Sequence, residues 1–259
     1  MGNRAKGKTS KAGKGECEEM SVGTRLTSEI FSSCDWHSVG EQMDAKGFAL
    51  MPQVLDREIC DEFIANYDDL NYRKTVVMER HRFGQGEYKY FGYPLPSLLQ
   101  TAREEIYPHL ALIANRWAEQ LRADIRYPET FSIFQERCRR NGQLKPTPLI
   151  LKYGKGGFNT LHQDLYGEVY FPMQVAFFLN EPDEDYTGGE FVLAEQIPRA
   201  QSKAIVLRPR RGDMIVFTTS SRPVLGVKGH YRANMRHGVS EVTSGERHTL
   251  GVIFHDAHS

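Results

Sequence analysis

The spacing of apolar residues divides the chain into two parts near residue 146. Before this point, apolar residues recur mainly at helical spacing. The pattern predicts a weak helix over about 27–42, a short strand over 47–52, and helices over 56–67, 97–123 and 128–141. Asp56 is the expected N-cap of the second helix, and Pro108 should kink or split the third. Residues 73–96 are aromatic and basic, and we expect them to be irregular.

After residue 146 the pattern becomes that of β-strands separated by Gly, Pro and Asp turns. It predicts strands over 149–153, 174–179, 191–194, 204–207, 214–217 and 249–254. Many short strands after a helical half favour an α+β fold, with a barrel or jelly roll buttressed by helices. We find no internal repeat, and we expect residues 25–259 to form one domain. Residues 25–145 would be its helical support and 146–259 its β core.

The composition is that of a globular chain without a global charge bias. The 259 residues are 40% apolar, with 14 Phe and 12 Tyr, and 33 basic residues balance 33 acidic ones. Any surface for nucleic acid must therefore be local. The four cysteines are scattered without a CxxC pair, which indicates free thiols in a reducing compartment. They are Cys17, Cys34, Cys60 and Cys138.

The first 24 residues predict a disordered basic tail. Five basic residues precede Glu16, in a segment rich in Gly, Ser and Lys. Gly2 is followed by Lys6 where a myristoylation motif requires Ser or Thr. We see neither a secretory signal nor a membrane-spanning stretch. We expect a cytoplasmic protein without membrane contact, and a nuclear or nucleic-acid role for the tail is an open alternative.

The candidate chemistry begins with His162 and Asp164. Of the nine histidines, His162 is the one followed two positions later by an acidic residue. Residues two apart on a strand project to the same face, so both side chains can bind one metal. Two histidines and one carboxylate form the facial triad of non-haem Fe(II) oxygenases. A third ligand must then come from a distant strand, and the candidates are His230, His237, His248, His255 and His258.

Arg247 favours His237 among these candidates. His237 is the one histidine with an arginine ten positions later, and we place both residues at the edges of adjacent predicted strands. A guanidinium can bind a carboxylate through two parallel hydrogen bonds, which a lysine cannot do. Taken singly, His237 could be a turn residue and Arg247 a surface cation. Together with the HxD pair 73 residues upstream, they predict one site.

The segment 153–254 resembles the double-stranded β-helix core of the Fe(II)/2-oxoglutarate-dependent dioxygenases. It has the triad, Tyr153 nine residues before His162, a TGGEF hairpin at 187–191 and an RGDMIVF strand entry at 211–217. Three longer runs, HQDLYGEVYFPMQV, GGEFVLAEQ and RHGVSEVTSGERHTLGVIFHDA, are similar to a mostly bacterial subfamily. That subfamily is associated with AlkB-type oxidative demethylases of damaged nucleic acid. With GQGEYKYFGYPLP and ANRW, the similarity covers most of 45–257.

The resemblance implies residue roles and a reaction. His162, Asp164 and His237 would ligate Fe(II), and Arg247 would bind the C5 carboxylate of 2-oxoglutarate. Tyr153 would donate a hydrogen bond to this co-substrate, or would be a core aromatic. With O2, the family converts 2-oxoglutarate to succinate and CO2 while hydroxylating a C–H bond. An N-methyl group hydroxylated in this way is lost as formaldehyde.

The substrate implied by the resemblance is an alkylated nucleobase in DNA or RNA. In support, Arg73, Lys74, Arg80, His81, Arg82 and Lys89 alternate with Phe83, Tyr88, Tyr90 and Phe91. Cations among aromatics suit phosphate contact and base stacking, although the aromatics could instead pack on the barrel. Two features differ from the repair demethylases: Leu151 replaces their Asn, and the ten-residue spacing to Arg247 is closer to that of prolyl hydroxylases. The alternatives are a hydroxylase of a protein side chain or small metabolite, or a non-catalytic metal-binding β-barrel module.

Overall fold

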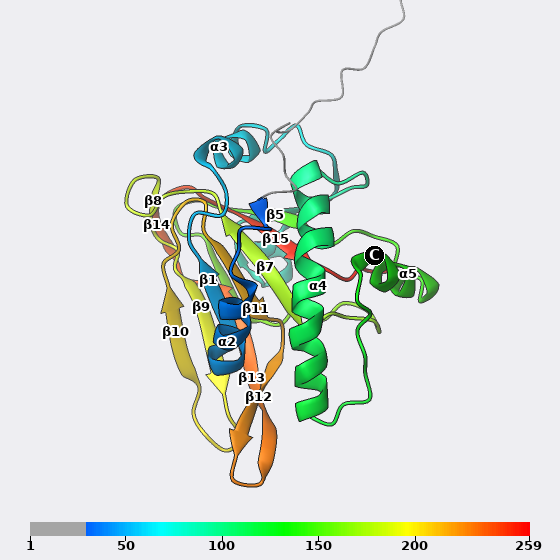
Figure 1. Ribbon diagram of the computed structural model, residues 1–259. Coiled ribbons are helices and arrows are strands. Elements are labelled where there is room, and N and C mark those ends of the chain that lie inside the picture. The colour runs from blue at the N-terminus through cyan, green and yellow to red at the C-terminus, as the bar shows by residue number, and fades with distance from the viewer. Residues whose placement is uncertain (1–29) are drawn as a thin grey trace, which may run out of the picture.

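A computed structural model describes residues 30–259 (Figure 1). The predicted tail, residues 1–24, lies outside the described residues. The α-helices are α2 (Trp36–Lys46), α3 (Arg57–Ala65), α4 (Ser97–Gln120) and α5 (Phe131–Arg140), and a 3₁₀ helix, η1, spans Met78–His81. The described helices include none with the length and apolar character that a bilayer crossing requires.

Two antiparallel sheets form the core. The seven-stranded sheet has the order β1 (Phe48–Met51), β11 (Met214–Thr218), β7 (Met173–Phe178), β15 (Arg247–Ile253), β5 (Leu149–Tyr153), β4 (Glu87–Phe91) and β2 (Tyr72–Val77). The six-stranded sheet has the order β10 (Lys203–Leu207), β9 (Phe191–Gln196), β13 (Gly229–Val239), β6 (Phe158–His162) and β3 (Gly84–Gln85), with β12 (Ser221–Gly226) paired to β13. A small sheet joins β14 (Val242–Gly245) to β8 (Tyr186–Gly188).

The alternation along β7 shows how the layers pack. Ala176 and Phe178 point inward and share one apolar cluster with Leu193 of β9 and Met235 of β13. Phe177 points to the other face, where a second cluster joins apolar residues of α2 to α5 with those of the strands beneath them. Figure 1 shows α4 lying across β7 and β15 on this outer side. Both faces of β7 are therefore covered, and all six residues of the strand are buried.

The predicted elements of the C-terminal half are confirmed, and several N-terminal ones are corrected. The segment 73–96 is not irregular: it forms β2, η1, β3 and β4. The N-terminal half is thus more than helical support, because it adds β1, β2 and β4 to the main sheet. Where we predicted a helix over 27–42, α2 spans 36–46, and residues 27–29 of the prediction lie outside the described residues. Asp56 precedes α3 without a side-chain capping bond.

Pro108 does not split α4, which runs unbroken from Ser97 to Gln120. A proline removes the hydrogen bond to the carbonyl four residues earlier, here that of Glu104. Glu104 is exposed, so water can satisfy that carbonyl. The helix also buries twelve residues against its neighbours, and this packing holds both halves in line.

Candidate active site

Antiparallel pairing of β6 with β13 brings the two predicted histidine ligands together. His162, the last residue of β6, is the direct cross-strand partner of His237. Directly opposed residues have Cβ atoms about 5 Å apart, and here the ring centroids are 4.2 Å apart. The His162 Nδ1–H donates to the Thr160 carbonyl at 2.7 Å, which leaves Nε2 free as a ligand. Phe217 packs its edge against the His237 ring at 4.8 Å.

Asp164 completes the group, but not from a strand as we predicted. β6 ends at His162, and Asp164 lies in the following irregular segment. Gln163 holds this segment, because its Nε2 donates to the carbonyls of Ser220 and Met235, each at 2.8 Å. The Asp164 carboxylate is therefore placed by the anchored turn after the strand rather than by strand alternation.

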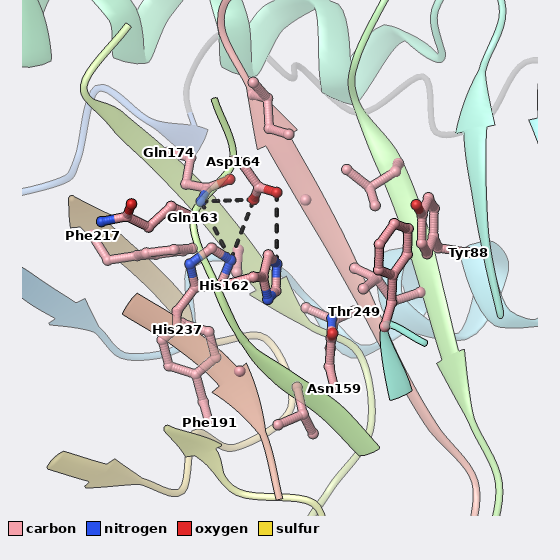
Figure 2. A pocket seen from close by; sticks show the side chains of 18 of the residues that line it. Tyr88, Asn159, His162, Gln163, Asp164, Gln174, Phe191, Phe217, His237 and Thr249 are labelled. Atoms are coloured by element: carbon pink, nitrogen blue, oxygen red, sulfur yellow. Dashed lines mark hydrogen bonds and ion pairs between the residues drawn. The ribbon is translucent and has the colours of Figure 1, made fainter. Parts of the chain in front are cut away.

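Two further side chains orient the carboxylate of Asp164. Tyr166 donates its hydroxyl to Oδ1 at 2.8 Å, and Gln174 of β7 donates Nε2 to Oδ2 at 3.0 Å. The Gln174 nitrogen also lies 3.5 Å from Nε2 of His237 (Figure 2). Hydrogen-bond partners of this kind fix the direction of a metal ligand. Neither residue was predicted as part of the site, although both lie within the HQDLYGEVYFPMQV run that resembles the bacterial subfamily.

The three ligand atoms fit one octahedral metal. Among residues 30–259, His162, Asp164 and His237 form the group of His, Cys, Asp or Glu side chains that can hold a metal, with ligand atoms within 4.8 Å of one another. Nε2 of His237 is 3.2 Å from Asp164 Oδ2, and Nε2 of His162 is 3.6 Å from Oδ1 (Figure 2). Ligands at right angles with bonds of about 2.1 Å lie roughly 3 Å apart. Two imidazoles and a carboxylate are the donor set of Fe(II) in such sites.

The electrostatics of the cluster favour the protonation states that a metal requires. Burial and the neighbouring His237 lower the pKa of His162, so its imidazole is neutral near pH 7. Burial by itself would raise the pKa of Asp164, but the hydrogen bond from His237 and the two imidazoles hold that pKa well below its ordinary value. The cluster thus presents an ionised carboxylate and a neutral His162 ring.

Arg247 is a buried cation without an anionic partner. It is 1% exposed and makes no ion pair within residues 30–259. Its Nη1 donates to Thr249 at 2.8 Å, and its buried Nε has no hydrogen-bond partner in the described structure. The rings of Tyr153 and Phe178 lie 5.6 and 5.3 Å from its Cζ. A buried charge is costly unless it is paired, so this guanidinium is suited to bind an anion from outside the chain.

Our expectation that His237 and Arg247 lie at the edges of adjacent strands is wrong. His237 is on β13 of the six-stranded sheet, whereas Arg247 begins β15 of the seven-stranded sheet. The two residues nevertheless line the same cavity, because the sheets face each other across it. Tyr153 is the cross-strand partner of Arg247 and also lines this cavity. Burial raises the pKa of Tyr153 to about 12, so its hydroxyl keeps its proton, and it accepts a 3.3 Å hydrogen bond from Asn159.

The cavity has a volume of about 230 Å³ and combines a polar centre with an aromatic wall. All five predicted site residues line it. Its wall includes Phe83, Tyr88, Tyr90, Tyr166, Phe191 and Phe217, and Leu151 lies among them. Phe83 is 46% exposed, so it marks the mouth of the cavity.

The aromatic and basic segment 73–93 divides into two groups. Lys89 is buried and pairs with Asp68 at 2.6 Å, and Phe91 belongs to the core, so these two residues serve packing. Arg80 and Arg82 are exposed, with no ion pair among the described residues, and they closely precede Phe83 in sequence. A second basic group, Arg208, Arg210 and Arg211, is neutralised by Asp183, Glu181 and Asp185.

Comparison with known proteins agrees with this geometry. The sequence profile of the Oxygenase-NA family, described as an oxygenase catalysing oxidative methylation of damaged DNA, matches residues 86–257. Two uncharacterized proteins from strains of Mycobacterium tuberculosis are 44% identical over 167 residues, which are 64% of this chain and 72% of theirs.

Solved structures share the fold. A prolyl-4-hydroxylase of Pseudomonas putida matches 86% of this chain and 100% of its own, with a TM-score of 0.51 and 15% identity. A 2OG-Fe(II) oxygenase-family oxidoreductase of Burkholderia pseudomallei matches 87% of this chain and 94% of its own, also with a TM-score of 0.51 and 15% identity. At this identity the likeness speaks for the fold alone, and it confirms the predicted double-stranded β-helix.

Proposed function

The chain belongs to the Oxygenase-NA family and is a 2-oxoglutarate-dependent non-haem iron dioxygenase, and from this premise we propose that it oxidises alkylated bases of nucleic acid. In this proposal, His162, Asp164 and His237 hold Fe(II). Arg247 binds the C5 carboxylate of 2-oxoglutarate, and Tyr153 donates its hydroxyl to the same co-substrate.

The proposed residue roles are supported by one observation: a cluster of three metal ligands and a buried arginine without an ion pair in the described structure line the same cavity. The His/Asp/His cluster has three ligands on one side and faces the cavity. The Arg247 guanidinium, buried and without an ion pair in the described structure, lines the same cavity. A dicarboxylate with a 2-keto group can satisfy both, since one end chelates a metal and the other is a free carboxylate. In this proposal the metal and Arg247 would be the two fixed points for 2-oxoglutarate.

When bound, iron and 2-oxoglutarate would supply the oxidation: O2 and 2-oxoglutarate would give succinate and CO2, and one oxygen atom would enter a substrate C–H bond. The chain supplies orientation and a dry site. Tyr166 and Gln174 hold the Asp164 carboxylate, and the Thr249 hydroxyl holds one nitrogen of Arg247 in place. Phe191 and Phe217 line the cavity beside His237 and limit water there. On an N-methyl carbon, the hydroxylated product loses formaldehyde and the base is demethylated.

Support for a nucleobase substrate comes from the family description and from the mouth of the cavity. Tyr88, Tyr90 and Tyr166 line the cavity that holds the metal site, and the exposed Phe83 lies at its entrance. Base stacking on such side chains contributes about 1–3 kcal/mol per base. The exposed Arg80 and Arg82 next to Phe83 suit phosphate contacts.

A hydroxylase of a protein side chain is the second candidate. The observation in its favour is the ten-residue spacing from His237 to Arg247, together with Leu151 in place of an amide residue on the cavity wall. This candidate uses the same iron and co-substrate sites, so substrate screening separates the two.

The test is substrate-stimulated turnover. Anaerobic protein with Fe(II) and 2-oxoglutarate is mixed with O2 and with N-methylated oligonucleotides, unmethylated oligonucleotides of the same sequence, or proline-containing peptides. We expect methyl-dependent succinate and formaldehyde in equal amounts. Succinate stimulated by peptides but not by methylated bases would reject the nucleobase proposal. Absence of succinate under all conditions, with metal bound, would reject the assigned residue roles.

A further inference from the structure

The outward face of β13 carries a basic stripe. It runs from the tip of the β12–β13 hairpin to Arg236, the residue before the metal ligand His237. We define this stripe by Lys228 in the turn and by His230, Arg232, Asn234 and Arg236 on β13. All five are exposed, whereas the alternate residues Ala233, Met235 and His237 are buried. Strand alternation therefore places the ligand His237 on the inner face and the stripe on the outer one. Figure 1 shows the hairpin projecting beyond the end of the sheet.

The cations of this stripe are uncompensated. Lys228, Arg232 and Arg236 make no ion pair or side-chain hydrogen bond with any described residue. The sequence from Ser221 to Ser240 contains no Asp or Glu. In contrast, Arg222 on the inner side of the same hairpin is 9% exposed and pairs with Glu195 at 3.0 Å. In a chain whose net charge is zero, the stripe is a local positive surface of the kind that a polyanion requires.

The spacing of the cations suits a repeating anion. Arg232 and Arg236 are four residues apart on β13, so they project on one side about 13 Å apart, and Lys228 lies beyond them in the turn. From end to end the stripe spans roughly 26 Å, which is about eight phosphate steps of 3.4 Å along a duplex strand. The inner end of the stripe, Arg236, is adjacent in sequence to the ligand His237. A bound strand would therefore run along β13, from the hairpin tip toward the end of the strand that carries His237.

We propose that this stripe binds the phosphate backbone of the nucleic acid whose alkylated base enters the cavity. The inference rests on the proposed function for the identity of the polyanion. Each cation contacts a phosphate and releases counterions, so binding is independent of base sequence and weakens as salt rises. At the tip, Leu225 and Val227 are 73% and 106% exposed, and they can contact the groove between the backbones.

The test measures the salt dependence of binding to an unmethylated, fluorescein-labelled 20-base-pair duplex by fluorescence anisotropy. The variant is K228S/R232S/R236S. Each lost phosphate contact lowers the slope of log Kobs against log[salt] by about 0.9, so the triple variant should lose about 2.7 of the wild-type slope. R232K/R236K keeps the charges and should keep the slope.

The matched control removes three other exposed cations without ion pairs in the described structure. R122S/R139S/K145S has the same change in net charge, and these residues lie in or beside α4 and α5 rather than on β13. It should bind the duplex like the wild type. Both triple variants should keep the wild-type melting temperature, because all six side chains are exposed.

Three results would overturn the proposal: an unchanged slope in the stripe variant, an equal loss in the control, or a loss of binding confined to vesicles of anionic phospholipid. Failure of the proposed function gives a different result. Succinate formation on a methylated nucleoside, which is too small to reach the stripe, should be unchanged in the stripe variant. If the wild type oxidises no methylated base at all, the function proposal fails, while the duplex-binding slopes still decide the stripe.

Discussion

Replacing Arg247 with Met tests the co-substrate site most directly. Nη1 of Arg247 already donates to Thr249, and its buried Nε has no partner in the described structure, so the guanidinium can still bind an incoming carboxylate. Two hydrogen bonds to a charged group, at about 1.5–3 kcal/mol each, give roughly 3–6 kcal/mol. At 1.4 kcal/mol per tenfold change, the Kd for 2-oxoglutarate should rise by about 10²- to 10⁴-fold. R247K keeps the charge but not the fork, so its loss should be intermediate.

The thermal stability of R247M gives a second, independent test of the role of Arg247. Arg247 is buried without an ion pair in the described structure, and its charge is compensated by aromatic rings, by hydroxyl groups such as that of Thr249 and by the more distant Glu190. Replacing a buried charge that has no ion pair with an apolar side chain of similar length is neutral or stabilising. We therefore expect the melting temperature of R247M without 2-oxoglutarate to equal or exceed that of the wild type. At 100 times Kd, 2-oxoglutarate should stabilise the wild type by about 2.7 kcal/mol, and this gain should vanish in the variant.

The assay is calorimetric titration of 2-oxoglutarate into anaerobic, Mn(II)-loaded protein, with thermal unfolding measured in parallel. A Kd within threefold of the wild type would refute the reasoning, because the anion would then have another partner. A large fall in melting temperature together with an unchanged Kd would make Arg247 a packing residue.

Three further predictions follow from the site and the core. H162A and H237A should each abolish tight Mn(II) binding, seen by electron paramagnetic resonance, with the far-UV circular dichroism unchanged; retained binding would exclude that histidine as a ligand. Q174L should weaken Mn(II) binding by about 10- to 100-fold, because Asp164 loses the donor to Oδ2, and an unchanged affinity would remove Gln174 from the positioning role. Burial lowers the pKa values of His248 and His255 to about 4, below the unfolded value of about 6.5. The unfolded chain therefore binds more protons between pH 6.5 and 4, so stability is complete above pH 6.5 and falls by up to about 1.4 kcal/mol per pH unit for each histidine as pH decreases. In urea unfolding at pH 7 to 4.5, H255Q should show a shallower decline, and a slope equal to that of the wild type would contradict this linkage.

Part of the N-terminal half could not be predicted, because its strands do not follow a simple apolar alternation. β4, with the sequence EYKYF, has a lysine in its buried part. Lys89 is tolerated there because Asp68, 21 residues away, pairs with it. Such a strand is basic and aromatic in sequence, and only its pairing with β2 and β5 makes it part of the sheet. Pro108 is a similar case, since the packing of α4 overrides a local helix breaker.

The amino-acid sequence by itself determined the change from helical to strand periodicity, most strands of the core and the residue types of the site. Side-chain chemistry is local information: an HxD pair and a second histidine followed by an arginine can be recognised without knowing where they lie. Only the tertiary structure decided that His162 faces His237 across an antiparallel pair, that an anchored turn carries Asp164, and that Arg247 is buried without an ion pair in the described chain. These relations depend on strand register and on packing between residues far apart in sequence, and a one-residue change of register would turn every side chain of a strand to the other face.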